Sequence, residues 1–195
     1  MKRTFAATAV IAASMFGAAS AQTTGTEVQR NANQQQRIEQ GLQSGSLSTG
    51  EAAKLEKGET KVERMEANAN KDGNLSAAEK ARIQKAQNKE SAAIARAKTN
   101  DRTGNPNSAS SQRMQADVQR NVNQQNRIEQ GVKSGALTTH ETAKLERGQA
   151  HVTATEARAG ADGHVGAAEQ KAVQAKENRQ SKRVFKQKHD AQKAS

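Results

Sequence analysis

The chain lacks cysteine, tryptophan and tyrosine, and its 195 residues include a single proline. The absence of cysteine excludes disulfide bonds, thiol nucleophiles and thiolate metal sites. Aromatic residues make up only 2% of the chain, so platforms on which nucleic-acid bases could stack are also missing. Stability must therefore come from packing between helices or from binding.

Large apolar side chains are scarce as well. Leu, Ile, Val and Phe account for 20 of the 174 residues from 22 to 195, which is below the proportion of roughly one-fifth at which composition begins to suggest disorder. Burial of so few side chains barely opposes an ordering cost of about 1 to 2 kcal/mol per residue. We therefore expect a thin core and marginal stability.

The first 21 residues have the pattern of a secretory signal peptide. Lys2 and Arg3 form a charged start, an apolar stretch of small residues follows, and Ala19-Ser20-Ala21 matches a cleavage site. No cysteine follows for lipid attachment, and no later run approaches the roughly 18 apolar residues that a membrane span needs. The sequence thus predicts an exported protein, periplasmic or secreted.

The net charge is +11, and it falls to about +9 when Lys2 and Arg3 are removed. A positive balance favours anionic partners. Acidic and basic residues alternate along most of the chain, however, and this pattern is also typical of an ordinary solvated helical surface. Composition leaves both interpretations open.

A 52-residue segment occurs twice, because residues 28–79 recur as 118–169 with 31 identical positions and no gap. Such a duplication predicts two copies of one supersecondary unit. We expect a first helical repeat at 27–98 and a second at 117–190 that ends in a basic helix or tail. Residues 99–112 contain Pro106 and several small polar residues, and they are predicted to form a flexible linker.

Apolar spacing predicts three helices in each repeat and an all-α fold. In the first repeat they cover about 27–43, 49–67 and 77–98. The first carries a stripe at spacings of three and four, formed by Val28, Ala32, Gln35, Ile38 and Leu42. The second carries a stripe of Leu55, Gly58, Val62 and Met65.

Four turns share one local chemistry. Gly45 can end a helix in the left-handed conformation, Ser48 can cap the next helix, and Glu51 completes a capping box. The same device recurs in three further sets: Gly73, Ser76 and Glu79; Gly135, Thr138 and Glu141; Gly163, Gly166 and Glu169. These turns predict sharply defined helix starts.

One of these turns, residues 68–79 (NANKDGNLSAAE), has Gly at its sixth position, an aliphatic residue at its eighth and Glu at its twelfth. It resembles the calcium loop of the EF-hand family over these 12 residues and their flanking helices. The resemblance implies that Asn68, Asn70 and Asp72 provide side-chain oxygens. It also implies a backbone carbonyl from Asn74, a water-bridged contact from Ser76 and a bidentate carboxylate from Glu79.

The loop departs from the family at its first position, where Asn68 replaces the usual Asp. Only Asp72 and Glu79 remain as charged ligands, which predicts weak calcium binding on the order of 10⁻⁴ to 10⁻³ M. The equivalent window, 158–169, keeps only Asp162 and Glu169 and is not expected to bind calcium. If loops pair, as the family's loops do, Leu75 should meet Val165 of the other repeat.

No hydrolase, phosphate-loop or zinc-protease motif occurs, and the thin core offers little room for a catalytic cleft. The sequence predicts a non-enzymatic protein that acts in binding or scaffolding, with one weak calcium site as its only cofactor site. Two alternatives stay open: a calcium-responsive EF-hand-like module, and a basic protein that associates with anionic cell-envelope surfaces. The partner is an unidentified protein or an anionic envelope component, and the lack of aromatics and the export signal disfavour nucleic acid.

Overall fold

The computed structural model describes residues 14–191, and every regular element in this range is a helix. The helices follow one another in the order α1 (Ser14–Ser44), α2 (Thr49–Ala69), α3 (Ala77–Lys98), α4 (Ala109–Lys133), α5 (Thr139–Ala159) and α6 (Ala167–Lys188). The prediction of an all-α fold is confirmed.

The predicted helix boundaries hold best where a capping residue marks them. The third predicted helix agrees with α3 at both ends, and α2 ends two residues later than expected. The first helix begins well before the expected residue 27, because the Ala, Ser, Gly and Thr residues that precede it include no proline to stop it. Most of the predicted signal peptide, residues 1–13, lies outside the described residues.

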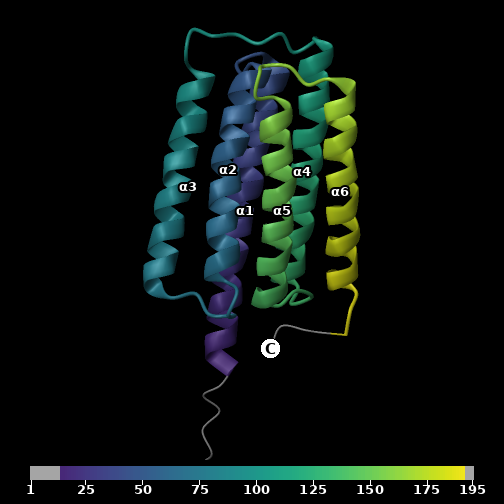
Figure 1. Cartoon of the computed structure of the whole chain (residues 1–195). Helices are drawn as coiled ribbons and strands as arrows, with labels where there is room; N and C mark the ends of the chain where they lie inside the picture. The colour runs from purple at the N-terminus through teal and green to yellow at the C-terminus, as the bar shows by residue number, and fades with distance from the viewer. Residues whose placement is uncertain (1–13, 192–195) are drawn as a thin grey trace, which may run out of the picture.

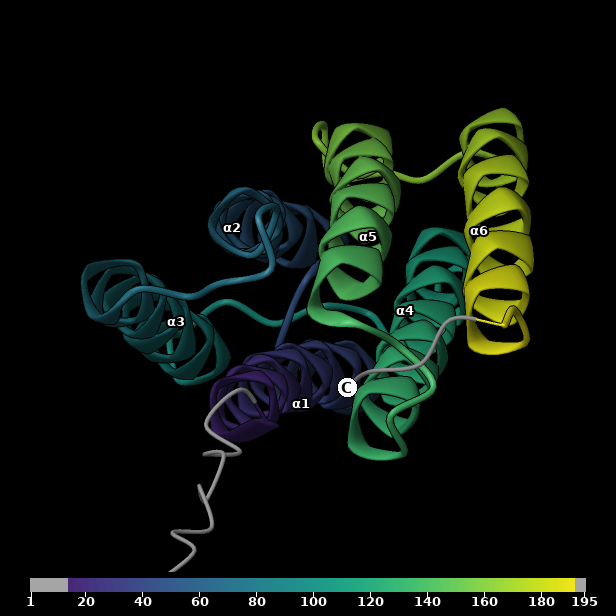
Figure 2. The same ribbon diagram turned by 90° about the horizontal axis from the view of Figure 1, so that it is seen from below.

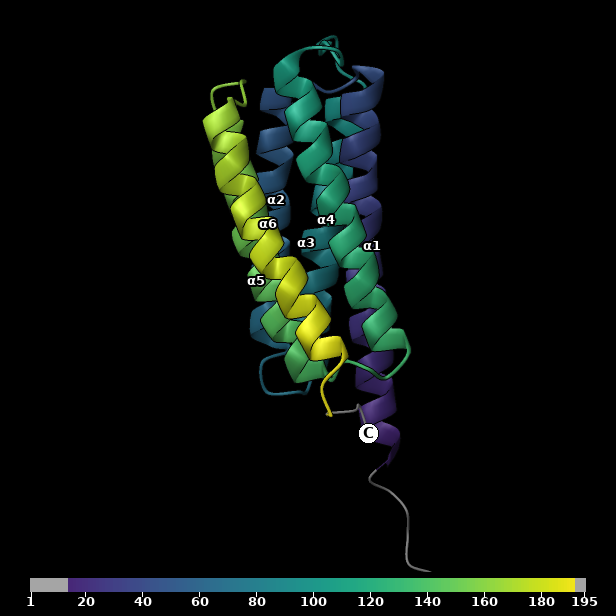
Figure 3. The ribbon, with the colours of Figure 1, turned by 90° about the vertical axis from the view of Figure 1, so that its right-hand side faces the viewer.

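The six helices form one bundle in which two of the three pairs of equivalent helices pack together (Figure 1). The most extensive contacts join α1 to α4 and α2 to α5. Helix α3 packs on α1 and α2 at one edge, and α6 packs on α4 and α5 at the opposite edge, as the views from below and from the side show (Figures 2 and 3).

The connection between the two halves is shorter than predicted. Helix α4 begins at Ala109, so residues 99–108 are what links α3 to α4. Ser108 caps α4 by accepting a hydrogen bond from the backbone N–H of Ser111, and a capped start of this kind sets the helix boundary locally. The backbone N–H of Gly104 donates to the carbonyl of Gly45 at 2.7 Å, which ties the connection to the α1–α2 turn.

The predicted capping chemistry is confirmed at three helix starts. Complete capping boxes join Ser48 to Glu51, Ser76 to Glu79 and Thr138 to Glu141. At the fourth start, Gly166 has no side chain to offer, and Glu169 accepts only the backbone N–H of Gly166 at 2.8 Å. The four turn glycines all have positive φ, between 69° and 90°.

The apolar core consists of two clusters at opposite ends of the bundle. One gathers near the α1–α2 turn and includes Leu42, Leu47 and Met114. The other gathers near the α4–α5 turn and includes Val132, Leu137 and Val184. The predicted stripe on α1 is buried, but Met65 of α2 is 36% exposed, because the inward face of α2 is occupied by other residues.

Candidate functional site

Glutamate residues occupy the inward face of α2 between the two apolar clusters. Glu56, Glu59, Glu63 and Glu66 follow at spacings of three and four, which places them on one face of a helix, and each is at most 1% exposed. Burial of a carboxyl group is costly unless it is hydrogen-bonded or neutral. The stability of the interior therefore depends on the groups that surround these carboxyl side chains.

Amide side chains from α1 and α4 provide the hydrogen bonds. The Asn31 amide donates to Glu66 Oε2 at 2.5 Å, and the Gln35 amide donates to Glu56 Oε2 at 2.9 Å. The same bonds recur 90 residues later, between Asn121 and Glu156 and between Gln125 and Glu146. Positions that are identical between the two repeats thus form a matching hydrogen-bond network in each half.

The two networks meet at the contact between α2 and α5. Glu63 Oε1 accepts hydrogen bonds from Thr153 Oγ1 and from the Gln125 amide, each at 3.2 Å. Residues 63 and 153 are equivalent positions of the two repeats. Equivalent positions of the two repeats therefore contact each other where the two halves meet.

Burial raises the pKa of eleven interior carboxyl groups, of which Glu39 is one. It raises the pKa of Glu56 to about 8, and that of Glu59 well above its ordinary value of 4.5, with the nearby charge of Glu90 adding to the effect. Burial likewise raises the pKa of eight further groups, to about 7 or 8 wherever a value is resolved: Glu27, Glu63, Glu66, Glu90, Asp117, Glu146, Glu156 and Glu177. Much of this interior is consequently protonated and uncharged near neutral pH.

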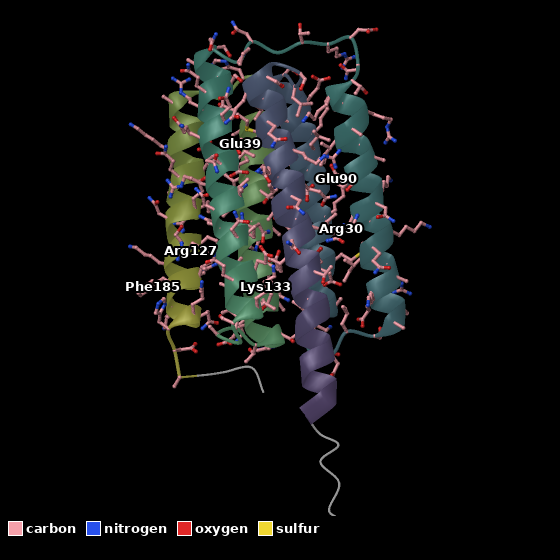
Figure 4. All side chains as sticks on the ribbon, turned by 180° about the vertical axis from the view of Figure 1, so that it is seen from behind. Arg30, Glu39, Glu90, Arg127, Lys133 and Phe185 are labelled. Carbon is pink, nitrogen blue, oxygen red and sulfur yellow. The ribbon has the colours of Figure 1, made fainter. Side chains whose placement is uncertain are left out.

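The fold separates the two signs of charge. Thirteen of the twenty Asp and Glu residues are buried, whereas no Lys or Arg among residues 24–191 is buried. Arg30, Arg127 and Lys133 lie on the outside of the α1–α4 face, while Glu90 lies between α3 and its neighbours (Figure 4). Charges that alternate along the sequence therefore produce a cationic exterior over an acidic interior.

The six predicted calcium ligands do not all point into the α2–α3 turn. Asn70 is 2% exposed, and its amide donates to Glu27 Oε2 at 3.4 Å and to the Glu66 carbonyl at 3.1 Å. Glu79 Oε2 accepts from the Ser76 N–H at 3.0 Å and from the Ser76 hydroxyl at 2.5 Å. Asn70 thus contacts α1, and Glu79 caps α3.

The other three residues of the loop remain on its surface. Asn68 and Asn74 are exposed, and Asp72 Oδ1 accepts a hydrogen bond from the Asn74 N–H at 3.1 Å. Across residues 14–191, no three His, Asp or Glu side chains are grouped so that they could hold a metal ion. Calcium binding at this loop stays a prediction.

The expected pairing of Leu75 with Val165 is wrong, because the turns that carry them lie at opposite ends of the bundle (Figure 1). Val165 lies instead beside α4, where its N–H donates to Ser110 Oγ at 2.8 Å. In the other turn, the carbonyl of Lys71 contacts His140 Nδ1 at 2.8 Å. The antiparallel packing of α2 on α5 separates the two turns.

None of the protein-family models, curated proteins or solved structures compared with this chain matches it. Among the helices within residues 14–191, none is both long and apolar enough to cross a membrane. The charge distribution and the clefts of the molecule are therefore the features that indicate its function.

Proposed function

We propose that this protein is a non-enzymatic, exported helical-bundle protein that binds anionic cell-envelope surfaces and acts there as a scaffold. The observation that carries the proposal is the separation of charge described above, which leaves a cationic exterior. Anionic lipid surfaces attract Lys and Arg side chains by about 1 kcal/mol each when these lie near the surface. A rigid cationic exterior is suited to such an interaction.

The two edge helices carry the densest positive charge. Helix α3 presents Lys80, Arg82, Lys85, Lys89, Arg96 and Lys98. Helix α6 presents Lys171, Lys176, Arg179, Lys182, Arg183, Lys186 and Lys188.

The acidic residues of these helices do little to neutralise them. Glu79 and Glu169 both lie in the first turn, where they cap the helix. Glu90 and Glu177 are buried, and burial raises the pKa of both. Beyond the first turn, the outer faces of α3 and α6 therefore carry only positive charge.

Vesicle cosedimentation tests the proposal. The purified protein should sediment with vesicles of phosphatidylglycerol and phosphatidylcholine but not with pure phosphatidylcholine, and added salt should release it because exposed charges are screened. Replacement of Lys182, Arg183 and Lys186 by Gln should weaken binding about 100-fold, from three contributions of about 1 kcal/mol. All three side chains are at the surface of α6.

A matched control replaces Lys54, Lys57 and Lys144 by Gln, which removes the same charge from exposed positions of α2 and α5. We expect this variant to keep most of its affinity. Equal loss in both variants would show that net charge, and not the edge helix, is responsible. Equal binding to charged and neutral vesicles would refute the proposal.

A further inference from the structure

An open cleft of about 560 Å³ lies between the second half of α2 and the start of α3. This volume falls within the range of sites for small molecules. The residues that line the cleft come from both sides of the α2–α3 turn, which Figure 1 shows at one end of the bundle. Four cationic side chains line the cleft: Lys61, Arg64, Lys71 and Arg82.

The positive charge of the cleft is only partly offset by neighbouring acids, through the interactions of Lys61 with Glu90 and of Arg82 with Glu79. Glu79 is the only carboxylate in the lining, and its Oε2 is held in the capping box by Ser76. Within residues 14–191, the ion pairs are Arg120 with Glu177 and Lys133 with Glu129, so none involves the four cations. None of the four is held in an ion pair with a residue of this range, so their side chains can turn toward a ligand.

The four cations are specific to the first repeat. The equivalent positions of the second repeat, 90 residues later, hold His151, Ala154, Ala161 and Ala172. All four cationic side chains are exposed, so packing does not require them. The buried amides of α1, in contrast, are kept in α4, where Asn121, Gln124 and Gln125 match Asn31, Gln34 and Gln35. The two halves have therefore kept these interior amides and differ in charge at this cleft.

We propose that the α2–α3 cleft binds a phosphate group, whether free or at the head of a lipid. The guanidinium groups of Arg64 and Arg82 can each donate two parallel hydrogen bonds to phosphate oxygens, and Lys61 and Lys71 add point charges. Met65, 36% exposed, lines the same cleft and offers an apolar contact to whatever carries the phosphate. The inference goes beyond surface association, because it requires a ligand at one defined place.

Isothermal titration calorimetry with two soluble probes tests this inference. Inorganic pyrophosphate represents the free form, and dihexanoyl phosphatidic acid, below its micelle concentration, represents the lipid form. Dihexanoyl phosphatidylcholine, which carries no net charge, is the negative control for the lipid. We expect at least one charged probe to bind at moderate salt. The comparison between the two probes assigns the source of the phosphate.

Two variants locate the binding. Arg64→Gln with Arg82→Gln should weaken binding by about tenfold or more, since charge-assisted hydrogen bonds are lost. The matched control, Arg147→Gln with Arg158→Gln, removes the same charge from exposed positions of α5 and should change affinity less than about twofold. Met65→Ser should weaken only the lipid probe.

Absence of binding by both charged probes, or an equal loss in the cleft and control variants, would overturn the inference. The outcome is separable from that of the vesicle experiment. Pyrophosphate binding without vesicle binding would refute the proposed surface association alone. Vesicle binding that survives in the Arg64 and Arg82 variant, with neither charged probe binding to the native protein, would refute only the phosphate cleft.

Discussion

The replacement of Glu59 by Gln tests whether the interior carboxyl groups are uncharged in the folded protein. Glu59 is fully buried, and neither of its carboxylate oxygens has a hydrogen-bond partner among the described residues. The equivalent residue of the second repeat is Gln149, whose amide donates to Asn121 Oδ1 at 2.7 Å. A glutamine is therefore already accommodated at this position in the other half.

The direction of the effect follows from proton binding. Burial, with Glu90 and Glu56 nearby, raises the pKa of Glu59 well above its ordinary value of 4.5. Above that ordinary value the unfolded chain releases the proton and the folded protein keeps it, so stability falls as pH rises toward the folded pKa. The stability that this proton provides is complete only below about pH 4.5.

As long as the pH is below the pKa of Glu59 in the folded protein, the size of this effect on stability depends on the pH alone. Each pH unit then costs about 1.4 kcal/mol of unfolding free energy. Glutamine does not titrate, so the stability of the Glu59→Gln variant relative to the native protein should rise between pH 5 and pH 7, by at most about 1.4 kcal/mol for each pH unit. At pH 5 the two proteins should differ by about 1 kcal/mol or less, the scale of one hydrogen bond.

Urea unfolding followed by far-ultraviolet circular dichroism at pH 5, 6 and 7 measures this difference. The reciprocal change, Gln149→Glu, is the control, because it introduces a carboxyl group at the equivalent buried position and should become more destabilising as pH rises. A stability difference for Glu59→Gln that stays constant from pH 5 to pH 7 would refute the reasoning, since a charged Glu59 in the fold would titrate as it does in the unfolded chain.

Three further predictions concern the ends of the helices. Gly104→Ala should lower the unfolding free energy by about 1 to 3 kcal/mol in urea, because a Cβ would lie 2.3 Å from the carbonyl oxygen of Leu47, and native stability in this variant would contradict the tight contact. Ser48→Ala removes the side-chain acceptor of the α2 capping box and should cost about 1 kcal/mol by the same measurement. Calcium titration should give a weak heat with the native protein that the Asp72→Ala, Glu79→Ala variant lacks, because this variant removes the two charged ligands of the predicted loop; identical heats would refute the calcium loop.

The parts of the fold that were predictable from the sequence are those set by local chemistry. The capping residues Ser48, Ser76 and Thr138 start helices at the expected positions, because a cap satisfies backbone N–H groups within one turn. Gly45 and Gly73 adopt positive φ for a similarly local reason. Such features need no knowledge of which helices pack together.

The acidic interior was not predicted, because it depends on the packing of α2 against α5 and of α1 against α4. A signal was nevertheless present: Glu59 and Glu63 lie on the same face of α2 as Leu55 and Val62, both of which are buried. Charge alternation along the sequence suggested solvated side chains, whereas the tertiary contacts place most of the acids inside. Asn70 is a similar case, since Thr24 and Glu27 of α1 determine its direction.

The contact between Glu63 and Thr153 distinguishes this single chain from a pair of identical subunits. In a pair of identical subunits packed in the same way, the residue at this position of one subunit would face the same residue of the other. Two glutamates would bring two acids together, and two threonines would remove the acceptor that the Gln125 amide uses. Because the halves belong to one polypeptide, an acid from one can face a hydroxyl from the other, a complementary match that no symmetric homodimer could form.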